Sequence, residues 1–478
     1  MHREVSRELR PEGAANAEQS ASSRRFSRAR EFSPAAPASS PPPFGPPATF
    51  LVFAPVCFTS SDPTLPVCND DDKQTLSIRI FSRTGTMSKR TTWLDCDPGR
   101  DDLVAILFAL HLPSIDLVGL SSVHGNASIQ HMTLNCVRIL CSFGTPEQIA
   151  RIPVCQGAAG PLVQDAKAHS FVHGIDGLAG VEGLLDPSHP VVAAKLAEAL
   201  KANAVVGIAD ACRALPPGVK LDLVATGSMT NIALFARVFP DLLYDKVERI
   251  VAMGGAEGRG NKSPVAESNV LCDAHAASIV FDLNLPVVLC PLNLTHTALF
   301  TPDIHRMLLC GSTRLPDTPP RTPTRDGHPV RAATTLRHAL STNLWFFAEA
   351  YKAKYGMPGP PLHDALTIAY ISNPELFTAS RYRVDVELTG FHAFGSTVVD
   401  LWDYKAGELD HDPSSWGRHG KNVLLLDSVD VSTFWLDVFL RTVERADRVV
   451  PINTEEERSR IASDSLSPLV TDRVHLPA

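Results

Sequence analysis

Residues 91–104 read "TTWLDCDPGRDDLV", which places four aspartates within eight positions after a short apolar run. The apolar run predicts a buried strand, and "DLVAILFALHL" after it shows helical spacing with acids in its first turn. Like charges this close repel, and each carboxyl group resists ionisation beside its neighbours. Because ligands of parallel α/β sheets gather beyond the carboxyl ends of the strands, we expect this loop to hold a cation.

A simpler interpretation of this loop is that its acids only cap the following helix. Gly99 allows a sharp turn, and Asp101 and Asp102 lie where a helix N-terminus favours negative charge. Capping explains one or two acids, but it does not explain why Asp95 and Asp97 are present as well.

From residue 91 onward, strand-like and helix-like segments alternate. Short apolar runs predict buried strands, and longer segments with helical periodicity separate them. The strand candidates are 91–95, 115–123, 221–227, 247–255, 285–292 and 382–390, and the helix candidates include 127–144, 190–203, 231–240, 272–282 and 335–356. This rhythm predicts a single-domain α/β fold with a mainly parallel, Rossmann-like sheet and helices on both faces.

The overall composition favours a globular enzyme and argues against charged macromolecular partners. The chain has 478 residues, of which 44% are hydrophobic and 20% charged, and its net charge is −8. Nothing in this balance indicates binding to nucleic acid or to an anionic membrane surface. No apolar run reaches the roughly 20 residues that span a bilayer. The ten cysteines form no CxxC pair, so we expect reduced structural thiols in a cytoplasmic protein.

The two ends of the chain differ from its middle. Residues 1–86 contain 11 of the 38 prolines and are of low complexity, which predicts a disordered N-terminal extension. Met87 is an alternative start, in which case residues 1–86 are not part of the mature protein. We expect a catalytic domain over 91–447 with a proline-rich insertion near 310–333, followed by a C-terminal tail over 448–478.

Two more strand ends offer oxygen ligands for a cation. A hard cation such as Ca²⁺ takes about 6–8 oxygen ligands, which include carboxylates and backbone carbonyls. Thr226 in "LVATGSMTN" can present its carbonyl, and Asp364 in "PLHDALTIAY" precedes an apolar helix. Between them, "MGGAEGRGNKSPVAESN" carries Asn261, Glu267 and Asn269, whose amides and carboxylate suit the hydroxyl groups of a sugar.

Several segments together resemble one known family. "DCDPGRDD", "HGIDGLAG", "ATGSMTNIALFARVFP", "MGGAEGRGNKSPVAESNVLCDAHAA", "PLNLTH" and "PLHDALTIAY" follow one another in this order. They are similar to the inosine–uridine preferring nucleoside hydrolase family, of the non-specific or pyrimidine type, from residue 91 to about 445. The resemblance implies Ca²⁺-dependent hydrolysis of the N-glycosidic bond of ribonucleosides in nucleoside salvage and catabolism. It also implies a homo-oligomer, either a dimer or a tetramer.

The resemblance also implies a role for each matching residue. Ca²⁺ would be held by Asp97, Asp102, the Thr226 carbonyl and Asp364, and Asp97 would also be the general base that takes a proton from the attacking water. Ribose hydroxyls would be bound by Asp101, Asn126, Asn261, Glu267 and Asn269, with Asp95 orienting the cluster. His173 and His363 would line the base pocket, and His363 is the candidate acid for the departing base.

These residue types suit the reaction. Breaking an N-glycosidic bond requires an activated water, stabilisation of positive charge on the sugar and protonation of the leaving base. A metal and a carboxylate can activate the water. His363, beside Asp364, can act near neutral pH. A structural role is the alternative for both histidines, and for His173 the two interpretations are evenly balanced.

Two departures and two alternative functions stay open. Ser268 stands where many family members have an aromatic residue near the base, which leaves the base preference open, and Arg100 has no assigned role. A haloacid-dehalogenase-like phosphohydrolase also has DxD after its first strand, but it needs Thr or Val where this chain has Gly99. A catalytically inactive nucleoside-binding protein would lack a metal ligand, whereas each implied ligand is present.

Overall fold

The computed structural model of the chain describes residues 89–165, 173–178, 180–311, 331–404, 412 and 414–464. Contacts along the chain divide it into two units, 1–82 and 83–478, and the described residues all belong to the second. The predicted N-terminal extension and most of the proline-rich insertion lie outside the described residues. No helix in the described ranges is both long and apolar enough to cross a membrane.

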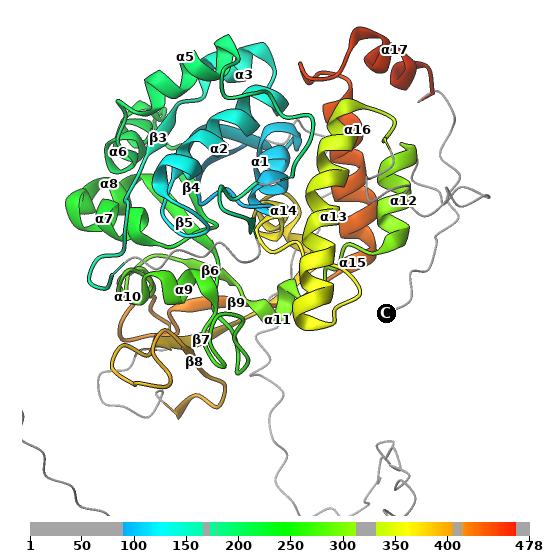
Figure 1. Cartoon of the computed structure of the whole chain (residues 1–478). Coiled ribbons are helices and arrows are strands. Elements are labelled where there is room, and N and C mark those ends of the chain that lie inside the picture. Colours follow the sequence, from blue (N-terminus) through cyan, green and yellow to red (C-terminus); the bar gives the residue numbers. More distant parts are fainter. Residues whose placement is uncertain are drawn as a thin grey trace, which may run out of the picture. The chain divides into compact units, whose positions relative to one another are not determined.

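The second unit is built on a nine-stranded sheet with the order β3-β2-β1-β4-β5-β6-β9-β7-β8 (Figure 1). The pairings from β3 to β9 are parallel, and β7 pairs antiparallel with both β9 and β8. The strands are β1 (Arg90–Cys96), β2 (Ile115–Ser122), β3 (Val154–Gln156), β4 (Leu221–Ala225), β5 (Val247–Met253), β6 (Val287–Cys290), β7 (Phe377–Val386), β8 (Thr397–Asp400) and β9 (Val423–Val429). The predicted α/β fold with a mainly parallel sheet is confirmed.

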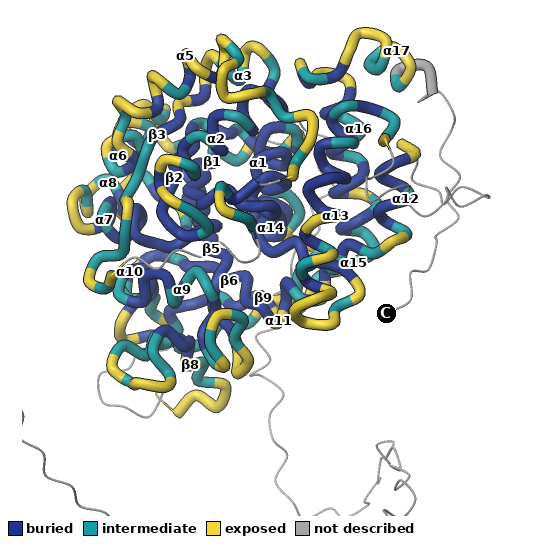
Figure 2. The backbone as a smooth tube through the Cα atoms, in the orientation of Figure 1, coloured by how far each residue is buried: buried dark blue, intermediate teal, exposed yellow. Residues whose placement is uncertain are grey.

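Helices cover both faces of this sheet, as predicted (Figures 1 and 2). They are α1 (Asp102–His111), α2 (Ile129–Phe143), α3 (Pro146–Arg151), α5 (Pro190–Ala199), α6 (Ala204–Ala214), α7 (Thr230–Val238), α8 (Pro240–Lys246), α9 (Ser268–Cys272), α10 (Ala274–Phe281), α11 (Leu292–Thr295), α12 (Pro302–Cys310), α13 (Thr335–Tyr355), α14 (Ala365–Ser372), α15 (Val431–Thr433), α16 (Arg441–Asp447) and α17 (Glu455–Asp464). A 3₁₀ turn (Pro374–Leu376) and a π-helical stretch (Phe434–Leu440) complete the described helices.

The period of two along each strand explains why two cores form. On β4, Leu223 packs into the cluster with α6, α7 and α10, whereas the next residue, Val224, packs into the cluster with α1, α2 and α13. Val287 and Val288 on β6 divide in the same way. Successive side chains of a strand point to opposite faces, so a continuous apolar strand requires helices on both sides.

The buried strand predicted at 382–390 is wrong in two respects: the observed strand ends earlier, and it is only partly buried. β7 ends at Val386, and within it only Val384 is buried. The physical reason is its place in the sheet: only β8 lies beyond it, so β7 is close to the edge and its side chains are partly exposed.

The segment after residue 447, which we predicted to be a tail, contacts α13 over its described part. Val450 and Asn453 are buried, and Asn453 Oδ1 accepts a hydrogen bond from the Leu336 backbone at 2.8 Å. Thr335 Oγ1 lies 3.2 Å from both carboxylate oxygens of Glu457 in α17. Residues 465–478 lie outside the described residues, and the boundary of the catalytic domain stays a prediction.

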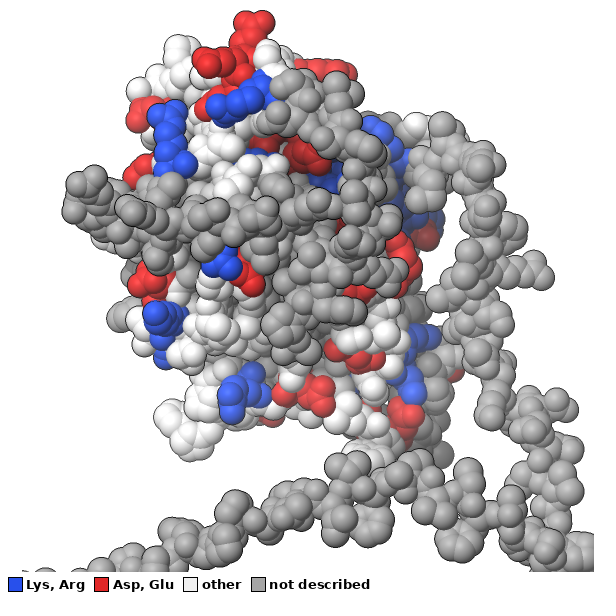
Figure 3. All heavy atoms as spheres, turned by 90° about the vertical axis from the view of Figure 1, so that its right-hand side faces the viewer, with Lys and Arg blue, Asp and Glu red and all other residues white. Residues whose placement is uncertain are grey.

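Charged side chains on the described part of the surface in Figure 3 are mixed in sign. Acidic and basic residues alternate across this face, so the net charge of −8 is not gathered there into one patch.

Candidate active site

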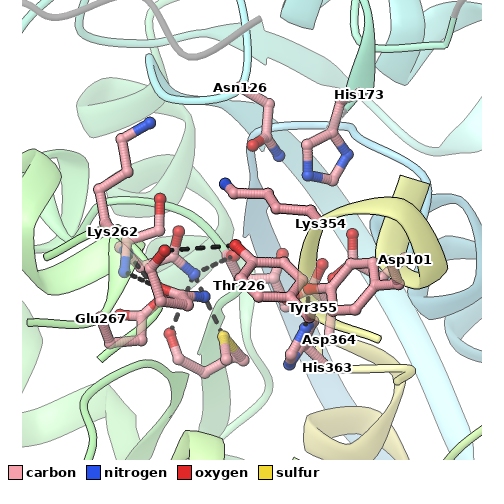
Figure 4. Close-up of a pocket in the computed structure, with 15 residues that line it drawn as sticks. Asp101, Asn126, His173, Thr226, Lys262, Glu267, Lys354, Tyr355, His363 and Asp364 are labelled. Carbon is pink, nitrogen blue, oxygen red and sulfur yellow. Dashed lines mark hydrogen bonds between the residues drawn. The ribbon is translucent and has the colours of Figure 1, made fainter. Parts of the chain in front are cut away.

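One pocket brings together most of the predicted site residues (Figure 4). It lies at the carboxyl ends of the parallel strands, where the segments after β1, β2, β3, β4 and β5 converge with α13 and the start of α14. Nine of the eleven predicted residues line it, namely Asp101, Asn126, His173, Thr226, Asn261, Glu267, Asn269, His363 and Asp364. The other two, Asp97 and Asp102, are buried and contact lining residues: Asp97 bonds to Asn126, and Asp102 to Thr226.

Two of the lining residues, Asp101 and Asp364, form a cluster of three carboxylates with Asp102. Asp101, Asp102 and Asp364 each offer one oxygen, and these oxygens lie within 4.8 Å of one another. Burial, and next the charge of Asp102, raise the pKa of Asp101 to about 7. Burial and then the neighbouring aspartates raise the pKa of Asp364 well above its usual range. Close carboxylates that resist ionisation are stabilised by a bound cation, which removes their mutual repulsion.

The cluster differs in membership from the implied ligand set. It contains Asp101, which the resemblance assigns to ribose, and Asp97 is not among its three members. Asp102 is oriented by the Gly99 backbone N–H at 2.9 Å and by Thr226 Oγ1 at 2.8 Å. The Thr226 carbonyl accepts a hydrogen bond from Asn269 Nδ2 at 2.8 Å, and it keeps a second lone pair for a metal.

Asp97 is held beside this cluster by the loop after β2. Its Oδ2 accepts the backbone N–H of Asn126 at 2.8 Å, and the Asn126 amide donates to the Asp97 carbonyl at 3.0 Å. Its Oδ1 is buried and has no hydrogen-bond partner among the described residues. Two glycines permit this position, because a Cβ at Gly125 would collide with Oδ2 and a Cβ at Gly227 would lie 2.8 Å from Oδ1.

Asp95 is buried and does not line the pocket. Its Oδ1 accepts hydrogen bonds from Ser121 Oγ and from Asn231 Nδ2, the latter at 2.8 Å. The Asp95 backbone carbonyl accepts the N–H of Thr226 at 2.8 Å. Asp95 therefore joins the ends of β1, β2 and β4 and supports the loops that carry site residues. Sequence reasoning did not find Asn231, which stands in an ordinary helix start.

The loop after β5 holds the predicted ribose ligands through backbone hydrogen bonds. The Glu267 carboxylate accepts N–H groups from Gly255, Asn269 and Val270 at 2.8–3.0 Å, and it caps α9. Asn261 Oδ1 accepts the N–H of Ser268 at 2.9 Å. Both side chains are thereby fixed before any sugar arrives, which lowers the entropy cost of binding.

His363 has both ring nitrogens engaged. Nδ1 lies 2.7 Å from Thr295 Oγ1, and Nε2 lies 2.9 Å from the Tyr351 hydroxyl. Burial, with the nearby His296 and His173, lowers the pKa of His363 well below its usual range. His363 is therefore neutral at pH 7, and both of its ring nitrogens contact hydroxyl groups.

His173 lies in the segment between β3 and α5 and is neutral at pH 7 as well. Burial, followed by the charge of Arg100, lowers the pKa of His173 to about 3. Its Nδ1 accepts the backbone N–H of Arg100 at 3.2 Å, and its ring lies 5.6 Å from that of Phe347. Because Nδ1 accepts, the ring proton of the neutral His173 is on Nε2, which can donate a hydrogen bond.

Helix α13 supplies lining residues that the sequence analysis missed. Tyr351, Lys354 and Tyr355 line the pocket, together with Lys262 of the loop after β5. A signal was present, because positions three and four apart lie on one face of a helix. Only the tertiary structure shows that this face meets the aspartate loop.

Arg100, which had no assigned role, connects α13 to that loop. Its side chain is fully buried, its Nη1 donates to the Asn343 carbonyl at 3.3 Å, and its guanidinium lies 3.9 Å from the centre of the Phe346 ring. Asn343 Nδ2 in turn donates to the Arg100 carbonyl at 2.7 Å.

Comparison with known proteins places the chain in a family. The family model described as inosine-uridine preferring nucleoside hydrolase matches residues 92–436. The chain is 38% identical over 310 residues to the pyrimidine-specific ribonucleoside hydrolase RihA of Citrobacter koseri, which covers 64% of this chain and 87% of the relative. It is 37% identical over 319 residues to RihA of an Enterobacter species, and this match covers 65% of the chain and 87% of the relative.

A solved structure shares the fold over nearly its full length. The purine-preferring ribonucleoside hydrolase from Gardnerella vaginalis is 26% identical, with a TM-score of 0.60, and the match covers 75% of this chain and 99% of that one. With its aspartate loop, sheet and pocket in the arrangement described above, the chain belongs to the inosine-uridine preferring nucleoside hydrolase family, a family of enzymes that cleave the N-glycosidic bond of ribonucleosides.

Proposed function

We propose that the chain hydrolyses ribonucleosides to free base and ribose with a Ca²⁺ ion bound at its aspartate cluster. The observation that carries this proposal is the set of three carboxylate oxygens within 4.8 Å of one another, two of them from residues that line the pocket. Further support comes from Asp97 Oδ1, which is buried without a hydrogen-bond partner in the described part of the chain.

The residues present fit a hard cation. The candidate ligands are carboxylates of Asp97, Asp102 and Asp364 and the Thr226 carbonyl, with Asp101 at the same cluster, and they include no sulfur or imidazole. When bound, the ion would lower the pKa of the attacking water and bind the vicinal hydroxyls of ribose.

The chain's own side chains complete the reaction. Asp97 takes the proton of the attacking water, since it is fixed by Asn126 and has a free oxygen. The ribose hydroxyls are bound by Asn126, Asn261, Glu267 and Asn269. Asp101, a member of the carboxylate cluster, also binds the sugar.

We propose that His363 acts on the leaving base through Tyr351. If Nε2 of His363 donates to the Tyr351 oxygen, the hydroxyl proton of Tyr351 is directed into the pocket, which Tyr351 lines. Tyr351 gives this proton to the base as the C–N bond breaks. The proton that Asp97 took from water then restores the Tyr351 hydroxyl in the following steps. His173 also lines the pocket and contacts the base.

No observation favours the two alternative functions. A phosphohydrolase would need the pattern that Gly99 interrupts, and an inactive binding protein would lack a cation ligand. We also propose a cytoplasmic location in nucleoside salvage, in keeping with the free cysteines of the described residues, and a homo-oligomeric state, which light scattering can measure.

A turnover screen tests the proposed function. Release of reducing sugar is measured with uridine, cytidine, inosine and adenosine, before and after chelation. The proposal predicts hydrolysis that chelation abolishes and Ca²⁺ restores. Full activity in the presence of chelator would exclude the ion, and no hydrolysis of any ribonucleoside would exclude the enzymatic role.

A further inference from the structure

The loop that carries two members of the carboxylate cluster has a buried carbonyl that its own helix does not use. Arg100 directly precedes Asp101 and is fully buried. In a regular α-helix the Val104 N–H would bind the Arg100 carbonyl, but this N–H binds the Asp101 carbonyl at 3.0 Å instead. A buried carbonyl needs a hydrogen-bond partner, so the partner of the Arg100 carbonyl has to come from another element.

Asn343 of α13 is that partner. Its Nδ2 donates to the Arg100 carbonyl at 2.7 Å, and Asn343 is also fully buried. The Arg100 side chain returns the contact, because its Nη1 donates to the Asn343 carbonyl at 3.3 Å and its guanidinium lies 3.9 Å from the centre of the Phe346 ring. The Arg100 N–H binds His173 Nδ1 at 3.2 Å, so side chains from distant segments hold both backbone groups of this residue.

The side-chain amide of Asn343 is not explained by packing alone. Its Oδ1 is buried and has no hydrogen-bond partner among the described residues. A buried polar atom without a partner destabilises a fold, and leucine would fill a similar volume without one. What asparagine supplies here, and leucine cannot, is the Nδ2 donor for the Arg100 carbonyl.

We propose that Asn343 is a positioning residue for the cation site, because its hydrogen bond fixes the peptide between Arg100 and Asp101 before the ion binds. The inference rests on the proposed function, in which a cation binds at the cluster of Asp101, Asp102 and Asp364. Rotation of this peptide would move the first two carboxylates away from the third. A loop that is fixed in advance loses less entropy on binding, so Asn343 increases the affinity for the cation although it is not a candidate ligand.

Titration with Ca²⁺ in a calorimeter tests this role without any substrate. The full chain is freed of metal with a chelator and compared with Asn343→Leu, which keeps the charge and nearly the volume but removes the donor. The Kd for Ca²⁺ should rise about 10- to 100-fold, as is typical when a group that orients a metal ligand is lost. Asn343→Ala is a second variant that avoids any clash of leucine, and its Kd should rise within the same range. An unchanged Kd would overturn the proposal.

Ser341→Ala is the matched control. Ser341 lies close to Asn343 on α13, is equally buried, and its Oγ lies 2.7 Å from His305 Nε2 of α12. Its replacement removes a buried hydrogen bond of the same helix but leaves the partner of the Arg100 carbonyl in place. The Kd for Ca²⁺ should therefore stay unchanged. A rise as large as that of Asn343→Leu would show a general loosening of α13 and overturn the proposal.

Hydrogen exchange separates positioning of the loop from damage to the whole fold. In the presence of chelator, the backbone amides of residues 101–105 should exchange faster in Asn343→Leu than in the unaltered chain, whereas those of β5 and β6 should keep their protection. Equal exchange of residues 101–105 in the two proteins would overturn the proposal, and so would an equal loss of protection throughout the sheet.

Failure of this inference differs from failure of the proposed function. If the unaltered chain binds no Ca²⁺, the ion of the proposed function is excluded, and the positioning role falls with it. If the chain binds Ca²⁺ but hydrolyses no ribonucleoside, the enzymatic role fails, and the Kd values still decide the role of Asn343. If the chain binds Ca²⁺ and hydrolyses uridine but the variants bind the ion equally tightly, only the positioning role is overturned.

Discussion

At the scale of single residues, the candidate site depends on how closely Asp97 approaches the backbone of neighbouring loops. Gly125→Ala adds one methyl group that collides with the Asp97 carboxylate. Displacing a catalytic group by about 1 Å costs on the order of 100-fold in rate, so we expect a loss of this size in kcat/KM for uridine. Gly390→Ala is the control, because a Cβ there meets its nearest atoms at 3.4 Å. Unchanged kinetics of Gly125→Ala would remove Asp97 from the mechanism.

The contact between His363 and Tyr351 yields a second prediction at this scale. Positioned proton donors contribute about 10²–10⁴-fold, so His363→Ala and Tyr351→Phe should each lower kcat for inosine by an amount in this range. A nitrophenyl riboside needs no protonation of its leaving group and should be hydrolysed at nearly the original rate by both variants.

Two results would contradict this assignment. If His363→Ala alone lowers kcat, His363 reaches the base without Tyr351. If both substrates suffer equally, the variants damage the neighbouring aspartate cluster, and the proton comes from another group.

At the scale of elements, α12 packs on α13 through a buried histidine. His305 is 4% exposed, its Nε2 lies 2.7 Å from Ser341 Oγ, and its ring stacks on that of Trp345. Burial lowers the pKa of His305 from 6.5 to about 4. The unfolded chain therefore binds an extra proton between these values, and stability is lost as the pH falls from 6.5 to 4.

This histidine should contribute to acid sensitivity by a measurable amount. The difference in pKa corresponds to roughly 3 kcal/mol across this pH range. Urea unfolding at pH 7 and pH 4.5 should show that His305→Gln loses less stability on acidification than the unaltered chain. The control His131→Gln, at the start of α2, should lose as much stability on acidification as the unaltered chain. An equal loss in all three proteins would show that His305 is not involved.

At the scale of the whole molecule, the buried aspartates make stability depend on the cation. Burial and neighbouring charges raise the pKa of Asp97, Asp101 and Asp364, so the ion-free site carries repulsion that a bound ion removes. Ligand present at 100 times its Kd adds about 2.7 kcal/mol, which should raise Tm by several degrees. Differential scanning fluorimetry should show this for Ca²⁺, and Asp364→Ala should abolish it. An equal rise in that variant would place the ion elsewhere.

The extent of the catalytic domain is a separate prediction at this scale. We propose that residues 91–447 form it and that residues 1–86 are dispensable. A chain that starts at Met87 should retain cooperative unfolding and the kcat/KM of the full chain. Failure of this shorter chain to fold would show that the N-terminal residues contribute to the domain.

The sequence by itself determined the sheet class and the location of the site. Period-two and helical patterns are local, and a loop such as "DCDPGRDD" after a parallel strand has one place to lie, at the carboxyl edge of the sheet. The nine lining residues that were predicted all come from such strand-end loops or from the segment before α14. Family resemblance added their roles, which remain proposals.

Only the tertiary structure decided what α13 does. The hydrogen bonds between Arg100 and Asn343 join positions 243 residues apart, and local patterns carry no information on such pairings. The same docking brings Tyr351 to His363 and Lys354 beside Lys262. Burial also decided the charge of His363. Its position before Asp364 in the sequence reveals neither its two hydroxyl partners nor its burial, and both depend on the folded chain. Desolvation depends on atoms from distant segments, and these meet only when the chain has folded.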